Sequence, residues 1–206
     1  MDIIAEMIGG MAGILLLILY FNGFAILGGI ALYVLQSLGL YQIAQRRGIK
    51  HTWMSWVPVL NTWILGSLSD QYNYVVYRKF RSARKWLLGL DIGICVIWFV
   101  SMVLGFVGML GLVSQMPQVN TPQDFFSMAM NQPMYVASLV GSIIYWVVAI
   151  AGIVLNFVCL RNLYASCQPK NKTVYTVFSI LFPVTIPIFV FICRNKDLGM
   201  PPRREV

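Results

Sequence analysis

Long apolar stretches alternate with short basic ones along this chain. Apolar residues dominate positions 8–44, 86–114, 134–160 and 173–193. A helix needs about 20 consecutive apolar residues to cross the hydrocarbon core of a membrane. The pattern therefore predicts an all-α, polytopic helical membrane protein that forms a single membrane domain over residues 1–206. We expect three secure transmembrane helices plus one or two further segments that are membrane-embedded, interfacial or re-entrant.

The N-terminal hydrophobic segment, residues 1–45, is longer than one membrane crossing requires. One interpretation is a single long and tilted helix whose N-terminus lies outside. The other is a tight hairpin that breaks at residues 21–23, with spans near 3–20 and 24–44 and the N-terminus inside. Lys and Arg collect in the cytoplasmic loops of membrane proteins, and none precedes Arg46. This charge pattern favours an N-terminus outside.

The next region, residues 46–85, is the basic face of the protein and contains eight of its fifteen Lys and Arg residues. Apolar residues recur at helical spacing from Trp53 to Leu68, with Thr52 as a candidate N-cap, but this stretch is too short to cross comfortably. Tryptophan suits the level of the lipid headgroups, and an internal proline kinks or breaks a helix. We therefore predict an interfacial or re-entrant element. Its candidate residues are Trp53, Trp56, Pro58, Asn61 and Trp63.

Residues 72–88 follow with an apolar stripe, surrounded by Arg and Lys, that includes Phe80. This pattern is typical of an amphipathic helix that lies along the inner leaflet and leads into the next span.

Residues 86–160 indicate a helical hairpin. Its outer loop, 115–133, has three prolines, one acid and no base. The second helix of the hairpin, 134–160, is expected to end before Arg161. Glycines recur every three residues toward the outer end of the first helix, where they would let another helix approach closely unless they are merely tolerated in lipid. These residues are Gly105, Gly108 and Gly111.

The last region, residues 161–206, contains a basic turn, a hydrophobic segment broken by prolines and a basic tail. Residues 173–193 are long enough to cross, but a simple crossing would leave the basic residues that follow outside. Pro183 and Pro187 offer a second interpretation, a broken helix that enters the membrane and returns, with neighbouring protein satisfying its backbone groups. Both interpretations stay open.

A faint internal repeat favours the returning form. Residues 40–58 contain a Leu-Tyr pair at the end of a span, a basic turn and a segment with a proline. Residues 163–183 contain the same features in the same order. A true repeat would give two parallel half-units, as in some transporters. The alternative is chance similarity between apolar sequences.

Composition and charge narrow the class of protein. With 59% hydrophobic and 11% charged residues, the chain has too few charges to cover a soluble globule. The formal net charge is +8, but no Lys or Arg occurs in residues 1–45, 86–160 or 173–193, so the charge forms no continuous patch for a nucleic acid. It instead follows the positive-inside pattern, which predicts a cytoplasmic C-terminus and attraction of anionic lipid headgroups.

Polar residues within the predicted spans are few. Asp91 is the only acid inside a secure span. Asn156 lies at a similar depth on the antiparallel helix and is a candidate hydrogen-bond partner, and Gln36 is a third candidate member of this cluster. An ionisable residue within a membrane is a functional-site hypothesis by default. The alternative is an acid near the interface that Lys85 or Arg161 neutralises.

No catalytic, cofactor-binding or metal-binding constellation occurs in the sequence. The single histidine, His51, and four cysteines without close pairing do not make a metal site. There is no phosphate loop, catalytic triad or carboxylate pair. We therefore expect a protein that is not an enzyme and that uses no cofactor.

Two stretches carry a resemblance to known sequences. Residues 41–49, followed by the W-V-P-x-x-N-x-x-x-L-G pattern of residues 56–66, are similar to a segment of small, uncharacterised bacterial multi-spanning membrane proteins. Residues 194–203 are similar to the tails of those proteins. The resemblance implies a multi-pass protein of the bacterial inner membrane and brings no known activity or site with it.

These observations leave two functional hypotheses. The first is an accessory or scaffolding component that acts through helix–helix contacts with a second copy or with another membrane protein. The second is a small oligomeric channel or small-solute transporter whose polar path is lined by Asp91, Asn156 and Gln36.

Overall fold

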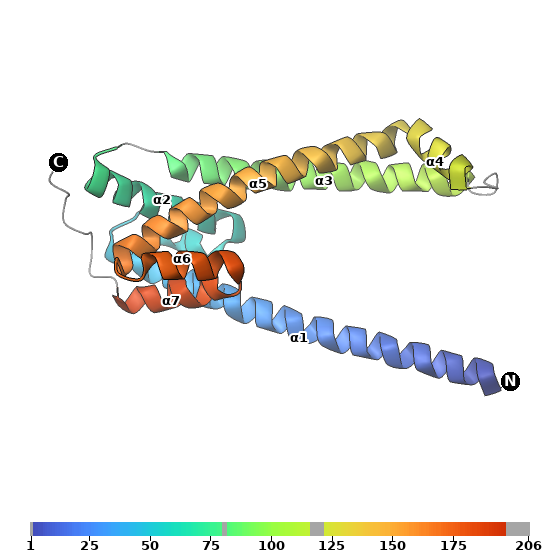
Figure 1. The fold of residues 1–206 in the computed structure, drawn as a ribbon, viewed down its shortest axis with the longest axis horizontal. Helices are drawn as coiled ribbons and strands as arrows, with labels where there is room; N and C mark the ends of the chain where they lie inside the picture. The colour runs from blue at the N-terminus through green and yellow to red at the C-terminus, as the bar shows by residue number, and fades with distance from the viewer. Residues whose placement is uncertain (1, 80–81, 116–121, 197–206) are drawn as a thin grey trace.

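The computed structural model describes residues 2–79, 82–115 and 122–196, which form helices and contain no strand. The predicted all-α fold class is thus confirmed. In Figure 1, α1 and the paired α3 and α5 form two arms that diverge from one end, which we call the convergent end, where α2, α6 and α7 gather. The elements are α1 (Asp2–Arg46), the 3-10 helix η1 (Thr52–Trp56), α2 (Pro58–Tyr77), α3 (Ala83–Gln115), α4 (Pro122–Asn131), α5 (Pro133–Cys167), α6 (Lys172–Leu181) and α7 (Thr185–Lys196).

Three of these helices are long and apolar enough to cross a membrane. They are the Asn22–Arg46 part of α1, the whole of α3 and the whole of α5. This finding confirms the three expected spans by length and composition, and it supports the assignment as a membrane protein.

α1 is one continuous helix of 45 residues. At about 1.5 Å of rise per residue it is about 67 Å long, which is more than twice the hydrocarbon thickness of about 30 Å. It passes through residues 21–23 without a break, so the hairpin interpretation is wrong and one continuous helix is formed, whereas the outside position of its N-terminus stays a prediction. Glycine weakens a helix interior by about 1 kcal/mol, but α1 contains no proline to remove a backbone N–H.

A glycine-based turn ends α1 and reverses the chain. Gly48 takes a left-handed φ of 66°. Its N–H donates to the carbonyl oxygen of Gln45 at 3.2 Å, and the N–H of Ile49 donates to that of Ala44 at 3.0 Å. These are the two bonds of a Schellman motif, in which glycine lets the chain satisfy the last carbonyls of a helix.

The tryptophan- and proline-containing element consists of two helices rather than one. Thr52 is the first residue of η1, and Pro58 is the first residue of α2. Thr52 lies inside η1, whose N-cap is His51, so the expected N-cap is wrong. The chain breaks before Pro58, which agrees with the expected kink or break at this proline, and Pro58 begins the second helix because the first residue of a helix needs no N–H donor. The hydroxyl of Tyr33 on α1 donates to the carbonyl oxygen of Trp56 at 2.7 Å, which fixes η1 against α1.

The amphipathic helix predicted over residues 72–88 is also wrong. α2 ends at Tyr77, Arg78 takes a left-handed φ of 52°, and α3 begins at Ala83. Residues 80–81, which include Phe80 of the expected apolar stripe, lie outside the described residues. α2 and α3 pack against each other as neighbours, so the basic region folds back on itself instead of following one axis.

α3 and α5 pack side by side to form the predicted hairpin (Figure 1). α5 continues to Cys167, so the expected end of this helix at residue 160 is wrong. The side chain of Arg161 is exposed, so its charge does not have to be buried and does not stop the helix.

The outer loop predicted over residues 115–133 contains a helix, α4. Proline at the first position and Asp124 in the first turn both favour a helix start, a signal that the loop assignment overlooked. Residues 116–121 of this loop lie outside the described residues.

α6 and α7 form a short helical hairpin of 10 and 12 residues. The chain breaks between them at residues 182–184, where Pro183 removes a donor and restricts the residue before it. A single continuous helix over residues 173–193 is therefore not formed. Residues 170–171 before α6 and residues 195–196 at the end of α7 line one cavity, so the chain enters and leaves this hairpin at the same end. The basic tail after Lys196 lies outside the described residues.

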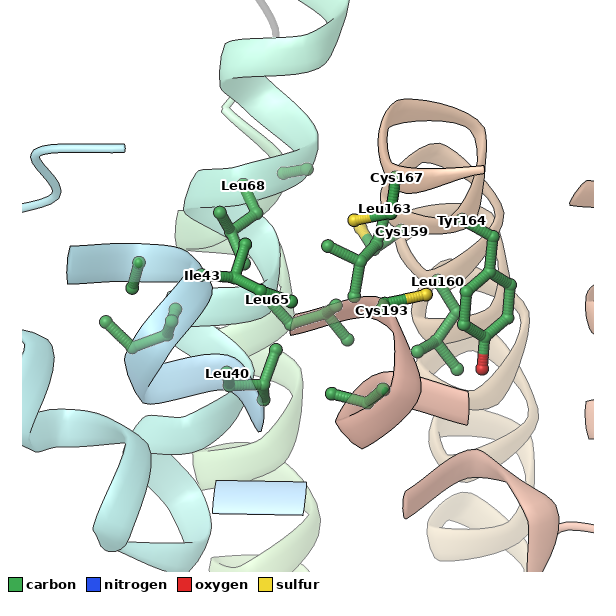
Figure 2. Packing of buried hydrophobic residues seen from close by; sticks show 14 of the residues in the cluster. Leu40, Ile43, Leu65, Leu68, Cys159, Leu160, Leu163, Tyr164, Cys167 and Cys193 are labelled. Carbon is green, nitrogen blue, oxygen red and sulfur yellow. The ribbon is translucent and has the colours of Figure 1, made fainter. Parts of the chain in front are cut away.

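The hydrophobic core lies at the convergent end. Figure 2 shows side chains of α1, α2, α5 and α7 that point toward one another there. Many large apolar side chains of α3 and α5, and those at residues 20 and 22–31 of α1, are exposed instead, as expected for surfaces that face lipid. The largest fully buried side chains include Tyr164, Leu40, Ile43, Ile64, Leu68, Leu87, Leu160, Leu163 and Val190.

The fold contains one arrangement twice. In each copy a long helix is followed by a basic turn, a short helix, a break and a returning helix: α1 with η1 and α2, and α5 with α6 and α7. The returning helices are exchanged, because α7 packs against α1 and α2 packs against α5. Gly39 of α1 lies against Val190 of α7, and the Asn162 amide of α5 donates to the Ser69 hydroxyl of α2 at 2.8 Å. We call each of these two arrangements a half-unit, and the repeat in the sequence stays a prediction.

We expect Gly66→Ala to destabilise the fold, because an added Cβ would lie 2.5 Å from the Cα atom of Arg84 and force α2 and α3 apart. Overpacking of this kind costs about 1–3 kcal/mol. The matched control is Gly89→Ala on α3, where nothing lies within 4 Å of the added Cβ. In detergent, circular dichroism should show a lower melting temperature for Gly66→Ala and an equal or higher one for Gly89→Ala. Equal melting temperatures for the two variants would contradict the close approach.

Candidate functional site

The hydrogen-bond partner of Asp91 is a residue outside the predicted polar cluster, and the cluster itself stays a prediction. Asp91 is partly buried on α3, and its side-chain hydrogen-bond partner is Thr62 on α2. The Thr62 hydroxyl also lies 2.8 Å from the carbonyl oxygen of Val59, and with one proton it donates to one of these acceptors at a time. Asn156 on α5 and Gln36 on α1 are partly buried, but within the described residues no hydrogen bond joins either of them to Asp91. Sequence reasoning missed Thr62 because it did not place α2 beside the start of α3.

The aromatic element has an exposed part and a buried part. Trp53 and Trp56 of η1 have exposed side chains. Asn61 of α2 is buried, and Trp63 packs against the core. The guanidinium of Arg84 lies over the Trp63 ring, 5.5 Å from its centroid, in a cation–π contact. The aromatic residues therefore serve both the outer surface of the convergent end and the contact between α2 and α3.

The three glycines of α3 face α5 of the same chain. The two helices run antiparallel, so each glycine three residues further along α3 contacts a residue about three positions earlier in α5. The small glycines permit close packing of this hairpin. A Cβ added to Gly108 would lie 2.7 Å from the backbone nitrogen of Tyr135. The patch is therefore occupied within the chain. The two other pairs are Gly105 with Ser138 and Gly111 with Gln132.

A carboxylate of α2 caps the N-terminus of α3. The two oxygens of Asp70 accept backbone N–H groups from Ala83 at 2.9 Å and from Arg84 at 3.3 Å. These N–H groups lack partners within their helix, and negative charge is favourable there. Burial nevertheless raises the pKa of the Asp70 carboxyl above its ordinary 3.8, and the two hydrogen bonds and the Arg84 charge oppose this rise only in part. Sequence reasoning missed the cap because Asp70 lies 13 residues before Ala83.

A cavity of about 490 Å³ lies beside this cap, between the turn after α1, the helix α2 and the start of α3. We call it the α2 cavity. One of its lining residues, His51, has a left-handed φ of 61°, a conformation that costs a residue other than glycine about 1–2 kcal/mol. Such strain persists only where the surrounding structure enforces it, often at functional sites. The polar and aromatic lining includes Lys50, His51, Trp63, Asp70, Gln71 and Arg84.

A second cavity, of about 510 Å³, lies at the corresponding turn after α5. We call it the α7 cavity, because the end of α7 forms one wall. Lys170 comes from the turn, and Lys196 comes from α7. Each cavity thus combines a lysine from the turn after a long helix with a second cation from another element. The remaining lining residues are Cys167, Gln168, Pro169, Asn171 and Asn195.

Polar side chains near these turns connect the two half-units. The Arg47 guanidinium donates to the Ser166 hydroxyl at 2.9 Å and lies 3.6 Å from the Cys167 sulfur. Arg46 donates to the backbone carbonyl of Arg194 on α7. Hydrogen bonds from the guanidinium groups thus hold the end of α1 against both α5 and α7, which places the two basic turns at one end of the molecule.

The described residues contain no group of three His, Cys, Asp or Glu side chains that could hold a metal ion. Comparison of the chain with protein-family models, curated proteins and solved structures finds no match. The candidate site is therefore defined by geometry alone. It consists of the two basic cavities at the convergent end of a membrane protein with three apolar, span-length helices.

We expect the free energy of unfolding to decrease as the pH rises above 3.8, the ordinary pKa of an aspartate. In Asp70→Asn, which has no carboxyl group at this position, the decrease should be smaller. Because burial raises the pKa in the folded state, the folded protein binds the Asp70 proton more tightly than the unfolded chain does. The stabilisation by this proton is full below the unfolded pKa and is lost as the pH rises through the folded pKa. The melting temperature of Asp70→Asn, measured relative to that of the wild type, should therefore rise progressively from acidic to neutral pH.

The matched control is Asp124→Asn in the first turn of α4, which should not reproduce this trend. A melting temperature of the wild type that rises relative to that of Asp70→Asn as the pH rises would contradict this prediction. It would show that the two N–H groups and Arg84 lower the pKa of Asp70 by more than burial raises it.

Proposed function

We propose that this protein is a non-enzymatic, multi-pass protein of the bacterial cytoplasmic membrane, and that it acts as an accessory or scaffolding component through helix–helix contacts. The observation that supports this role is the free arm of α1. Side chains at position 20 and at positions 22–31 are exposed, and nothing lies within 4 Å of a Cβ added to Gly23, Gly28 or Gly29. Figure 1 shows this part of α1 diverging from α3 and α5. In a membrane, an apolar helix with accessible glycines offers a surface for close packing by another helix.

The distribution of charge supports a cytoplasmic location for the convergent end. Short cytoplasmic loops carry an excess of Lys and Arg, and this end would face the same side. The start of α1 and the helix α4 would then lie on the outer side, and the C-terminus would follow α7 on the cytoplasmic side. The described cations that gather at this end are Arg46, Arg47, Lys50, Arg78, Lys79, Arg84, Lys85, Arg161, Lys170, Lys172, Arg194 and Lys196.

In this orientation, α6 and α7 form a re-entrant hairpin that enters from the cytoplasmic side and returns to it. Irregular backbone is tolerated at membrane depth where protein satisfies its polar groups. At the tip of the hairpin, the carbonyl oxygen of Phe182 accepts the hydroxyl of Thr185 at 2.7 Å, and the N–H of Phe182 donates to Phe178 at 2.8 Å. η1 and α2 make the corresponding excursion in the first half-unit.

A small oligomeric channel or small-solute transporter is the second candidate. The contact between Asp91 and Thr62 favours it, because it places a partly buried acid inside a span-length helix, where ionisable groups are costly and often functional. Asn156 and Gln36 do not join this contact, so the polar path would have to be completed by a second copy of the chain.

Single cysteines at Ser127, Lys170 and Asn195 test the proposed orientation, because all three side chains are exposed. The background carries Cys95→Ser, since the other three cysteines are buried. A membrane-impermeant thiol reagent should label position 127 on intact cells, and positions 170 and 195 only after permeabilisation. The protein without an added cysteine gives the background signal. Labelling of 170 and 195 from opposite sides of the membrane would overturn the re-entrant hairpin.

Asp91→Asn distinguishes the two candidate functions. For a scaffold, we expect Asp91→Asn to leave proton and potassium flux into proteoliposomes unchanged. In native membranes, a cysteine at Leu27 on the free arm of α1 should cross-link to another protein. A cysteine at Val103 on α3, which is also apolar and exposed, is the control and should not cross-link. Wild-type flux that disappears in Asp91→Asn, with cross-linking intact, would favour transport instead.

A further inference from the structure

The two basic cavities share features that indicate one kind of ligand. Their volumes, about 490 and 510 Å³, are nearly equal, and they lie at equivalent turns of the two half-units. Each is lined by two cations and by one glutamine whose Oε1 atom is buried and has no hydrogen-bond partner among the described residues. These residues are Lys50, Arg84 and Gln71 in the α2 cavity, and Lys170, Lys196 and Gln168 in the α7 cavity.

The cations and the glutamine amide oxygens of the cavities bind different groups of a ligand. Paired cations bind an oxyanion, and a phosphate offers several strong acceptor oxygens to them. A buried acceptor without a partner is unfavourable, and a hydroxyl group of a ligand would satisfy it. A group that meets both demands carries a phosphate and a free hydroxyl close together. We propose that each cavity binds the phosphate ester of a hydroxyl-bearing headgroup, with glycerol phosphate on an anionic lipid as the form that a membrane supplies.

The acid in the α2 cavity does not oppose this assignment. Both oxygens of Asp70 accept N–H groups from the start of α3, so its charge is directed at the N-terminus of that helix. Lys50 and Arg84 are the cations of the cavity wall, and Arg84 is also attracted to Asp70. Trp63, beneath the Arg84 guanidinium, adds an aromatic side chain of the kind that favours the headgroup level of a membrane.

This inference rests on the proposed placement of the convergent end at the lipid headgroups, but its test does not depend on the side of the membrane. The full-length protein in neutral detergent is titrated with dihexanoyl phosphatidylglycerol, phosphatidylmethanol and phosphatidylcholine. Native mass spectrometry counts the bound molecules, and titration gives their affinities. Cysteine labelling can therefore contradict the proposed orientation while the titration still shows lipid binding. The titration can likewise show no lipid binding while labelling supports the orientation.

We expect two bound phosphatidylglycerol molecules and weaker binding of phosphatidylmethanol, whose phosphate has the same charge but whose headgroup has no hydroxyl. Phosphatidylcholine, with a compensating cation, should not bind. Equal binding of phosphatidylglycerol and phosphatidylcholine would overturn the phosphate site. Equal binding of phosphatidylglycerol and phosphatidylmethanol would overturn the role of the glutamine oxygens.

Charge-neutralising variants assign each bound molecule to a cavity. Lys50→Gln should weaken one site roughly tenfold and Lys170→Gln the other, because each removes one charged hydrogen bond. Both side chains are exposed, so the fold should be retained, which circular dichroism verifies. The matched control is the pair Lys85→Gln and Arg161→Gln, two exposed cations at the same end but outside both cavities. An equal loss of affinity in the control pair would show general surface charge and overturn the proposal.

Soluble glycerol phosphate distinguishes the source of the headgroup. Weaker binding of glycerol phosphate than of phosphatidylglycerol would identify a lipid as the ligand, because the acyl chains then contribute. Equal affinity, lost in the same lysine variants, would support the phosphate ester site and identify a soluble ligand.

Discussion

The close contact between α1 and α7 is the constraint on which the rest of the structure depends. A Cβ added to Gly39 would lie 2.9 Å from the carbonyl oxygen of Val190, so only glycine permits this approach. α7 is too short to cross a membrane and finds its packing surface on the long helix of the other half-unit. In the corresponding contact, Asn162 of α5 donates to Ser69 of α2. Because each long helix holds the returning helix of the other half, neither half can separate without exposing the core.

This exchange also explains why the cations gather. It brings the turns after α1 and α5 together, and Arg47 of the first turn donates to Ser166 beside the second. Like charges at one surface repel each other over about 8–10 Å at physiological salt. Such a surface is tolerated where anionic groups lie opposite, as at the inner leaflet of a membrane. The fold thus places four of these cations on the walls of two separate cavities.

Features that depend on local sequence could be predicted, and features that depend on distant contacts could not. Hydropathy identified the three span-length helices, and Pro183 marked the break between α6 and α7. Pro58 likewise marked the break between η1 and α2, and it begins α2 because proline is tolerated at the first position of a helix. The Asp70 cap and the Thr62 partner of Asp91 depend on the antiparallel packing of α2 and α3, which no local pattern encodes. The two cavities depend on where α2 meets the start of α3 and on where the end of α7 meets the turn after α5, and no local pattern encodes these contacts.

The length of α1 provides an argument for a partner that does not depend on its exposed side chains. Its 45 residues give a helix of about 67 Å, and the sequence before Asn22 is largely apolar. To place all of it in a hydrocarbon core of about 30 Å, the helix would need a tilt of about 60°, beyond the range of about 0–40° seen for membrane helices. The packing of residues 39–44 at the convergent end further restricts this tilt. An apolar helix that extends beyond the lipid is unfavourable in water, and this supports the proposed role as a scaffold, in which another membrane protein would cover that part of α1.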